Sequence, residues 1–438
     1  MQQIKQAFAM MREERSFTAI CITVTAIAIA FTMVMATCYY IQIAPVYPEV
    51  NRARTLYMGY SDFYSEKQNR VVHATGFSPK AIERCFSQLE NVEAVAWVSN
   101  IASQCYIMRE DMRGEKLVWR KYTNPDFFKV YQFDFVCGKP FTQVDVDSRI
   151  CTAVISDGLA RYVFGTDHDV VGKMLAIDGI SYRVCGVVRE ASTLTERSYA
   201  QIYFPYSLDR PSFWDDEDVL YRGGFRMAFL VNSAEQEAAL CEELAEHARQ
   251  YHVYMESSGH GDWVWNQLGY PLIHWKSTFV SYPFETGGLY HVIFNAFTLF
   301  LLYLFVPALN LSGMISGRMN MRLAEMGIRK AFGARQGTLL KQVVTENLVL
   351  TTIGGCMGLL LSWMFIVLFR GWVFSVFFDS YDSRRMVELP NLSAEMLFSP
   401  LLFIVAFLFC AILNVMAALI PAWLSLRKPI VASMNERR

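Results

Sequence analysis

The side chains best suited to chemistry gather in one short stretch of the chain. His252, Glu256, His260 and Asp262 fall within eleven residues, and imidazole and carboxylate groups are ligands that Zn²⁺ takes in proteins. Their spacing matches no zinc signature, and the glycines that separate them favour a loop. Surface histidines are therefore the favoured interpretation, and a metal site is the alternative.

ATP hydrolysis would need a glycine loop with a lysine, GxxxxGK[ST], whose amides and ammonium hold the phosphates. The sequence contains no such string, because "GARQGT" at 333–338 lacks the lysine and follows no strand pattern. If ATP drives this protein, we expect the ATPase in a separate polypeptide.

A basic, glycine-punctuated segment lies between two apolar stretches. "RLAEMGIRKAFGARQGTLLKQ" at 322–342 carries five basic residues and three glycines. Glu325 and Arg329 stand in the favourable i to i+4 order for a helical ion pair. Gly333 permits the left-handed turn that ends a helix, and a second helix is predicted from Gly337. This element suits docking into a groove of another protein; the alternative is a basic loop that only fixes membrane topology.

Membrane helices must position this segment. The chain has 438 residues, of which 53% are hydrophobic and 18% charged, which indicates a membrane protein with a large aqueous domain. Four stretches lack Asp, Glu, Lys and Arg for the ~20 residues that cross a bilayer. A signal peptide is the alternative for the first, but its apolar run is too long. The predicted spans are 17–43, 287–317, 346–370 and 397–426.

The distribution of Lys and Arg predicts the topology, because basic residues near span ends stay in the cytoplasm. The long stretch 44–286 is then extracytoplasmic. No span has a charged residue at its centre, which argues against an ion-coupled transporter, and a net charge of −1 gives no reason to expect nucleic acid. The remaining segments are a cytoplasmic amphipathic helix at 1–16, a cytoplasmic segment at 318–345, a short outer loop at 371–396 and a cytoplasmic tail at 427–438.

Two strand-helix units flank the middle section of the outer domain. The first is a strand at 54–60 with a helix and strand over 78–99, capped by Ser78. The second is a strand at 226–232 with a helix at 233–251, where Ser233 and Gln236 stand at capping-box positions. The short β-branched runs over 105–208 predict an inserted β-rich subdomain. Six cysteines of this domain form disulfides or remain buried thiols, and the sequence leaves both open: Cys85, Cys105, Cys137, Cys151, Cys185 and Cys241.

An aromatic segment precedes the second span. "GDWVWNQLGYPLIHWKSTFVSYPF" at 261–284 has three Trp with several Tyr and Phe, and such rings prefer the headgroup layer of a membrane. A lipid-binding groove is the alternative interpretation.

Several of these stretches resemble one family. "EMGIRKAFGA" at 325–334 resembles the coupling segment of ABC transporter permeases of the MacB, LolC/LolE and FtsX kind, and "NPDFFKVYQFDFVCGKPFT" at 124–142 resembles that family's periplasmic core domain. The resemblance covers nearly the whole chain. It implies four transmembrane helices and a large α+β extracytoplasmic domain, with a porter-like part at 50–104 and 225–284 and the inserted β-rich subdomain at 105–208. The residues implied in ATPase coupling are Glu325, Met326, Gly327, Ile328, Arg329, Lys330, Ala331, Gly333 and Ala334.

The resemblance implies a permease in the bacterial inner membrane that is not itself an enzyme and binds no cofactor. ATP and Mg²⁺ would belong to a partner ABC ATPase subunit, whose hydrolysis moves the periplasmic domains of a homodimer or of a pair with a paralogous permease. Export or extraction of a peptide, drug or lipoprotein is expected, with a periplasmic adaptor and an outer-membrane channel as further partners. Phe332 departs from the smaller aliphatic residue usual in the motif, which bears on the choice of partner.

Within the family, the alternative is an FtsX-like regulator that controls periplasmic partners. Outside it, a receptor or scaffold would bind a ligand outside and recruit a signalling protein inside. A membrane-tethered hydrolase would need an outer catalytic cluster, which the sequence does not offer. The substrate is not readable from the sequence.

Overall fold

The structure is a computed structural model of the chain, in which two compact units are distinguished. The helical unit comprises Met1–Tyr40 and Ile293–Arg438, and the sheet unit comprises Ile41–Val292. The residues that the structure describes are 8, 11–12, 15–59, 61–65, 67, 69–74, 76–86, 89–99, 103–110, 114–209, 223–257, 263–266, 271–279, 290, 293–294, 297–298, 332, 335–378, 390–397 and 399–427.

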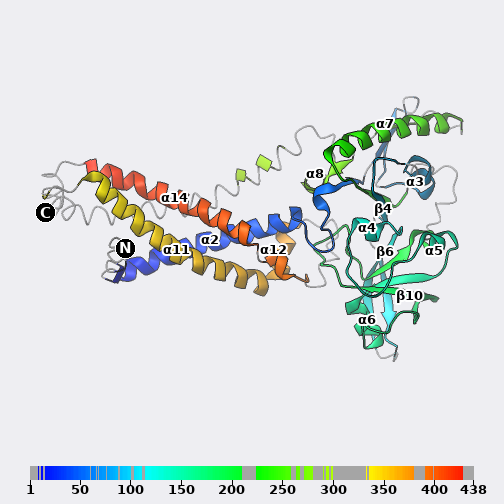
Figure 1. Cartoon of the computed structure of the whole chain (residues 1–438), viewed down its shortest axis with the longest axis horizontal. Helices are drawn as coiled ribbons and strands as arrows, with labels where there is room; N and C mark the ends of the chain where they lie inside the picture. Colours follow the sequence, from blue (N-terminus) through cyan, green and yellow to red (C-terminus); the bar gives the residue numbers. More distant parts are fainter. Residues whose placement is uncertain are drawn as a thin grey trace. The chain divides into compact units, whose positions relative to one another are not determined.

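Long apolar helices dominate the helical unit (Figure 1). Three of the described segments are long and apolar enough to cross a membrane: Thr18–Ile43, Gln336–Leu368 and Ala394–Met416. The predicted second span, 287–317, lies outside the described residues apart from short pieces, so a total of four spans stays a prediction. The described helices are α2 (Arg15–Ile43), α11 (Gln336–Leu368), α12 (Arg370–Phe377), α13 (Ala394–Leu397) and α14 (Pro400–Arg427).

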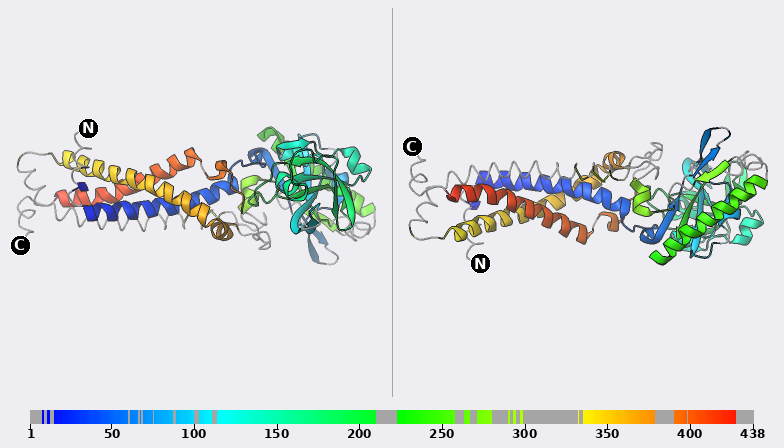
Figure 2. Two further views of the ribbon diagram at one scale, coloured as in Figure 1. Left: turned by 90° about the horizontal axis from the view of Figure 1, so that it is seen from below. Right: turned by 90° about the horizontal axis from the view of Figure 1, so that it is seen from above.

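Glycines let α11 approach its neighbours closely, and both views of Figure 2 show α2, α11 and α14 together. A Cβ added to Gly354 would lie 2.9 Å from the Thr25 side chain, and one added to Gly358 would lie 2.7 Å from the Ala26 carbonyl oxygen. A Cβ on Gly355 would meet a ring of α14. Small residues at such positions allow close backbone contact between membrane helices, and these three glycines provide it.

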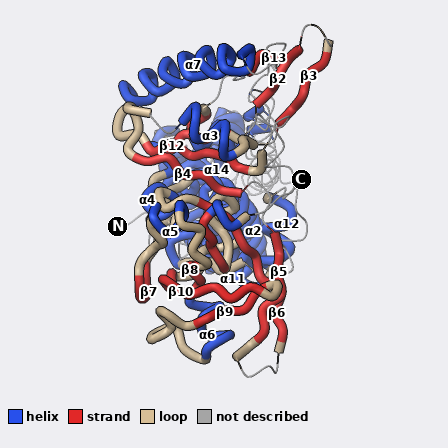
Figure 3. Tube along the Cα trace, turned by 90° about the vertical axis from the view of Figure 1, so that its right-hand side faces the viewer, coloured by secondary structure: helices blue, strands red, loops and turns tan. Residues whose placement is uncertain are grey.

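The sheet unit contains one large mixed sheet and one small sheet (Figure 3). The large sheet has the order β14-β1-β12-β4-β6-β11-β8-β10-β7, with β5 beside β6 and β9 beside β10; the small one has the order β13-β2-β3. The strands are β1 (Thr55–Met58), β2 (Ser61–Ser65), β3 (Arg70–Ala74), β4 (Ala94–Ser99), β5 (Ser103–Met108), β6 (Glu115–Thr123), β7 (Phe135–Gly138), β8 (Thr152–Ser156), β9 (Met174–Ile177), β10 (Ile180–Val188), β11 (Ile202–Pro205), β12 (Phe225–Leu230), β13 (Trp263–Asn266) and β14 (Leu272–Ile273).

The large sheet runs across the predicted boundary between the porter-like part and the inserted subdomain. Strand β4 pairs with β6 through Val98 and Thr123, and β6 then pairs in parallel with β11. The two parts thus share hydrogen-bonded backbone rather than lying as separate sheets. The helices of this unit are the 3₁₀ turns η1 (Arg52–Arg54) and η2 (Tyr206–Leu208), with α3 (Pro79–Phe86), α4 (Phe127–Val130), α5 (Gln143–Asp147), α6 (Asp157–Phe164), α7 (Ala234–Ser257) and α8 (His274–Phe279).

The predicted caps of the two flanking helices are present. The Ser78 hydroxyl accepts from the amide of Ala81 at 3.1 Å, and the Ser233 hydroxyl accepts from the amide of Gln236 at 3.2 Å. The Gln236 side chain reaches back to the amide of Asn232 at 2.6 Å. Each cap satisfies an amide that the first helical turn leaves without a partner.

Aromatic side chains from distant parts of the chain fill the core. Phe127 of α4 lies 5.5 Å from Tyr203 of β11 and 5.7 Å from Phe133, measured between ring centroids. All three side chains are buried, and such edge and offset contacts add to the burial of apolar area. Among the described cysteines of this unit, Cys105, Cys137, Cys151, Cys185 and Cys241 form no disulfide.

Candidate functional site

The predicted coupling residues lie outside the described part of the chain. Of the segment around them, the structure describes Phe332, whose side chain is 88% exposed, and residues from Arg335 onward. Helix α11 begins at Gln336, one residue before the position predicted for the second helix of this segment. The residues that stay a prediction are Glu325, Met326, Gly327, Ile328, Arg329, Lys330, Ala331, Gly333 and Ala334.

The four residues considered for a metal are only partly described. His252 and Glu256 lie one turn apart on α7, with Nε2 of the histidine 3.5 Å from Oε1 of the glutamate. His260 and Asp262 lie outside the described residues. The two described side chains are 30% and 57% exposed, so they form a surface pair on α7. Within the described ranges, no group of three metal-capable side chains occurs.

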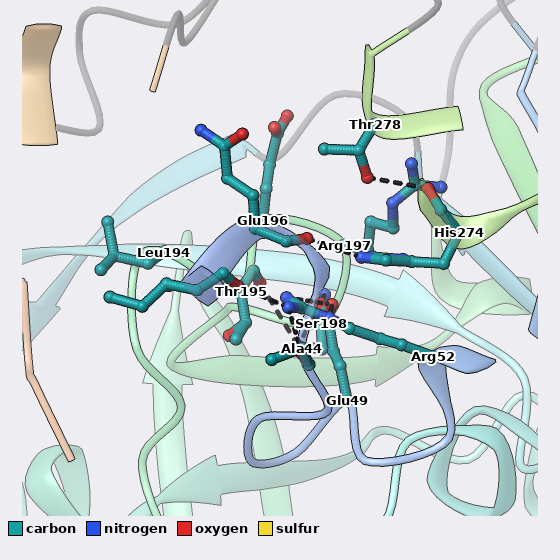
Figure 4. Close-up of polar contacts among 12 residues, drawn as sticks. Ala44, Glu49, Arg52, Leu194, Thr195, Glu196, Arg197, Ser198, His274 and Thr278 are labelled. Atoms are coloured by element: carbon teal, nitrogen blue, oxygen red, sulfur yellow. Dashed lines mark hydrogen bonds and ion pairs between the residues drawn. The ribbon is translucent and has the colours of Figure 1, made fainter. Parts of the chain in front are cut away.

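A buried polar cluster lies in the sheet unit, where the end of α2 meets a loop and α8 (Figure 4). We call it the junction cluster: Glu49, Arg52, Arg197, Ser198 and His274. Glu49 and Arg52 follow the last turn of α2, Arg197 and Ser198 belong to the loop 189–201 before β11, and His274 opens α8. Three parts of the chain that are far apart in sequence therefore meet here.

Arg52 joins the end of α2 to the cluster. Its side chain is 3% exposed, and its Nε and Nη2 both lie 2.8 Å from Oε2 of Glu49. Its Nη1 donates to the carbonyl oxygens of Ile41 at 2.6 Å and of Ala44 at 2.7 Å. The last carbonyls of a helix have no partner within the helix, so this guanidinium satisfies them and also complements the negative end of the helix dipole.

Glu49 is satisfied on its other oxygen by the loop. The amide and hydroxyl of Ser198 donate to Oε1 at 3.1 and 2.8 Å. Burial by itself raises the pKa of Glu49, but the positive charges of Arg52 and Arg197 and the Ser198 hydrogen bond outweigh it and lower the pKa to about 2. The carboxylate is therefore ionised at neutral pH, as a buried ion pair with full hydrogen bonding requires.

The loop that carries Ser198 is itself fixed to the sheet. The ammonium of Lys121, on β6, donates to the carbonyl oxygens of Glu196 and Arg197 at 2.7 Å each. The hydroxyl of Tyr203 donates to the carbonyl oxygen of Ser198 at 2.8 Å. Lys121 is 3% exposed, and a buried ammonium is tolerated only with such partners. The loop is thus held by the region that the sequence predicts as the inserted subdomain.

Helix α8 joins the cluster through two contacts. His274 Nε2 lies 2.9 Å from the carbonyl oxygen of Gln42, in the last turn of α2. Arg197 donates through Nη2 to the hydroxyl of Ser277 at 2.8 Å, and its guanidinium lies 3.8 Å from the ring centroid of Tyr57. The end of α2, the loop and α8 are therefore bonded to one another within the sheet unit.

His274 is neutral, and its tautomer follows from its partner. A carbonyl oxygen only accepts, so Nε2 carries the proton, while Nδ1 has no hydrogen-bond partner among the described residues. Burial, followed by the positive charges of Arg197 and Arg52, lowers the pKa of His274 to about 3. Each charged group of the cluster meets a protein partner, so the cluster is suited to holding segments together rather than to catalysis.

Acidification should weaken the sheet unit through His274. In the unfolded chain, His274 binds a proton below its ordinary pKa of 6.5, whereas in the folded chain it binds one only near pH 3. The free energy of unfolding therefore falls as the pH drops from 6.5 towards 3. From pH 7 to pH 5 we expect a loss of about 2 kcal/mol, and His274→Gln should remove most of it. Denaturant midpoints at both pH values, followed by tryptophan fluorescence, measure this, and the same pH dependence in both proteins would contradict it.

The sequence did not reveal the junction cluster. Glu49 marked only the end of the first uncharged stretch, and His274 was one polar residue among aromatic ones. The available signal was a glutamate three residues before an arginine, directly beyond a predicted span. That signal is weak without knowledge of Ser198, which lies 149 residues further along the chain.

Comparisons with known proteins agree with the arrangement of a large outer domain between membrane helices. The family model of the MacB-like periplasmic core domain matches residues 20–247, and that of the FtsX-like permease C-terminal region matches residues 291–430. The first alone covers more than half of the chain.

Curated relatives include the macrolide export ATP-binding/permease protein MacB of Escherichia coli strain K12, which is 26% identical over 313 residues, or 68% of this chain and 40% of the relative. The protein of the same name from Shigella flexneri is 27% identical over 253 residues, or 54% of this chain and 34% of the relative. The chain thus spans 34–40% of the length of these relatives.

Solved structures to which the chain is similar include the periplasmic region of MacB from Actinobacillus actinomycetemcomitans, with a TM-score of 0.30, 16% identity, and coverage of 48% of this chain and 88% of that one. Another is the extracellular domain of the ABC-type transporter YknZ from Gram-positive bacteria, with a TM-score of 0.32, 16% identity, and coverage of 47% and 98%. On the two family matches, the chain belongs to the family of ABC transporter permeases that combine a MacB-like periplasmic core domain with an FtsX-like C-terminal permease region.

Proposed function

We propose that this chain is the transmembrane subunit of an ABC transporter whose separate ATPase subunit binds ATP and Mg²⁺. The observation that carries the proposal is the presence in one chain of a MacB-like periplasmic core region and an FtsX-like permease region. In this proposal the chain itself hydrolyses nothing and holds no cofactor. It takes up the motion of the ATPase through the coupling residues at 325–334.

The junction cluster supports a mechanical role for the first helix. Helix α2 runs without a break from Arg15 to Ile43, and its residues from Ile41 onward belong to the sheet unit. Arg52 and His274 bond the carbonyl oxygens of Ile41 and Gln42 in this last turn, at 2.6 and 2.9 Å. A displacement of the helix end would therefore pass to the loop 189–201 and to α8, because buried ionic contacts resist separation.

The assembly in this proposal lies in the inner membrane, with both termini and the coupling residues in the cytoplasm and the sheet unit in the periplasm. Two copies, or this chain and a paralogous permease, pair with two ATPase subunits. The substrate is a peptide, drug or lipoprotein that the moving periplasmic domains export or extract. A periplasmic adaptor and an outer-membrane channel would complete an export path.

The proposal predicts that an ATPase subunit copurifies with this chain through the coupling residues. The double substitution Gly327→Leu with Arg329→Glu should abolish this copurification, because it alters both the close approach and the charge of the docking helix. The measurement is the amount of ATPase recovered with the tagged chain from solubilised membranes, together with its ATP hydrolysis.

A matched control lies just beyond the motif. Arg335 and Gly337 are exposed, and a Cβ added to Gly337 meets nothing within 4 Å. The double substitution Arg335→Glu with Gly337→Leu should therefore leave the ATPase bound. Equal recovery of the ATPase with both double variants, or ATP hydrolysis by the chain alone, would overturn the proposal.

A further inference from the structure

Helix α8 turns one side into the junction cluster and the other side outward. His274 is buried, with 4% of its surface exposed, whereas the next residue, Trp275, is 36% exposed. Lys276 is exposed as well, and its ammonium lies 5.6 Å from the Trp275 ring centroid. A large aromatic ring and a cation therefore lie together on the surface of the sheet unit.

The contact of His274 with α2 places this pair at a definite depth. The apolar part of α2, Thr18–Ile43, has 26 residues and is about 39 Å long at ~1.5 Å per residue. The hydrocarbon core of a bilayer is about 30 Å thick, so the last turn of a helix that spans it reaches the headgroup layer. His274 Nε2 lies 2.9 Å from the carbonyl oxygen of Gln42 in this turn, so α8 lies at the same level.

We propose that Trp275 and Lys276 form a membrane-surface anchor that contacts the headgroup layer of the outer leaflet. The indole ring suits this layer because it combines a large apolar face with one N–H donor. The Lys276 ammonium would meet lipid phosphates, since a long basic side chain reaches from a membrane edge to the interface. Ile43, at the end of α2, is an apolar side chain that is 43% exposed as well.

The anchor would fix the depth of the junction cluster. Arg197 of the cluster bonds Ser277 of α8 at 2.8 Å, so α8 cannot leave the membrane surface without pulling on the loop that holds Glu49. The inference requires that α2 spans the membrane, and it does not require the ATPase. If the proposed coupling to the ATPase failed its test, the inference about the membrane-surface anchor would be unaffected.

The test uses the full chain reconstituted in vesicles of phosphatidylethanolamine and phosphatidylglycerol with brominated acyl chains, which quench nearby tryptophans. The emission lost on Trp275→Phe should be quenched more by bromines near the headgroup end of the chain than by bromines near its middle. Trp119 is buried in the sheet unit, so neither lipid should quench the emission that is lost on Trp119→Phe. Trp363 is exposed within a candidate span, so both lipids should quench the emission that is lost on Trp363→Phe.

Two results would overturn the anchor. One is that neither brominated lipid quenches the emission assigned to Trp275, which would leave α8 in water or against another protein. The other is stronger quenching by the deep bromines than by the shallow ones. The phosphate contact has its own test: Lys276→Glu should reduce the quenching of Trp275 in vesicles with phosphatidylglycerol, Lys276→Arg should preserve it, and equal quenching in both variants would refute this contact.

Discussion

Replacing Arg52 by Met is expected to destabilise the sheet unit by about 3–5 kcal/mol, the usual cost of removing one partner from a buried ion pair. The substitution keeps an unbranched apolar stem but leaves the Glu49 carboxylate, whose side chain is 1% exposed, without its cation. It also removes the donor that the Ile41 and Ala44 carbonyls share. Denaturant unfolding of the purified chain, followed by tryptophan fluorescence, measures the loss.

The neighbouring Arg54 provides a matched control. It lies in the same 3₁₀ turn, and its Nη1 pairs with Oε2 of Glu93 at 2.8 Å. The two side chains are 35% and 46% exposed, so water screens the pair and Arg54→Met should cost no more than about 1 kcal/mol. Equal losses for the two substitutions would contradict the account of the junction cluster.

A second variant separates the unpaired charge from the lost packing. Arg52→Met combined with Glu49→Leu removes both charges of the pair, so the double variant should be more stable than Arg52→Met alone. The Ile41 and Ala44 carbonyls would still lack their donor, so recovery should be incomplete. In the proposed transporter, both variants should lower transport more than they lower ATP hydrolysis by the partner, because the helix end is no longer held.

The elements were largely predictable from the sequence, because their signals are local. Uncharged stretches indicated the described spans, and the caps at Ser78 and Ser233 depend on residues within four positions of each other. The β-rich nature of 105–208 followed from short β-branched runs. The continuity of the large sheet could not be predicted in this way, because it depends on the pairing of Val98 with Thr123. No local pattern specifies which strands are neighbours in a sheet.

The junction cluster could not be predicted for a related reason. His274 meets the carbonyl of Gln42 across 232 residues of sequence, and a buried charge looks the same in a sequence as a solvated one. The pKa of Glu49, lowered to about 2, arises only after folding brings Arg52, Arg197 and Ser198 around it. The coupling residues stay a prediction from the resemblance to a family, whereas the junction cluster was found from contacts in the structure alone.

The largest effect in the helical unit is expected at Gly358. A Cβ at this position would lie 2.7 Å from the carbonyl oxygen of Ala26 and 3.0 Å from Cβ of Ile29. The carbonyl belongs to the backbone of α2 and cannot rotate away, so Gly358→Leu must push α11 from α2. Overpacking of this kind costs about 1–3 kcal/mol, and Gly354, one turn earlier and 2.9 Å from Thr25, extends the same contact.

Gly337 on the same helix provides the comparison, because a Cβ there meets no atom within 4 Å. Leucine is a better helix former than glycine by up to about 1 kcal/mol, so Gly337→Leu should raise the thermal stability of the detergent-solubilised chain or leave it unchanged. Gly358→Leu should lower the thermal stability, although leucine is the better helix former at this position too. The two substitutions add the same side chain to the same helix and differ in what that side chain meets. A Gly358→Leu variant as stable as the parent would show that α2 and α11 do not pack through their backbones.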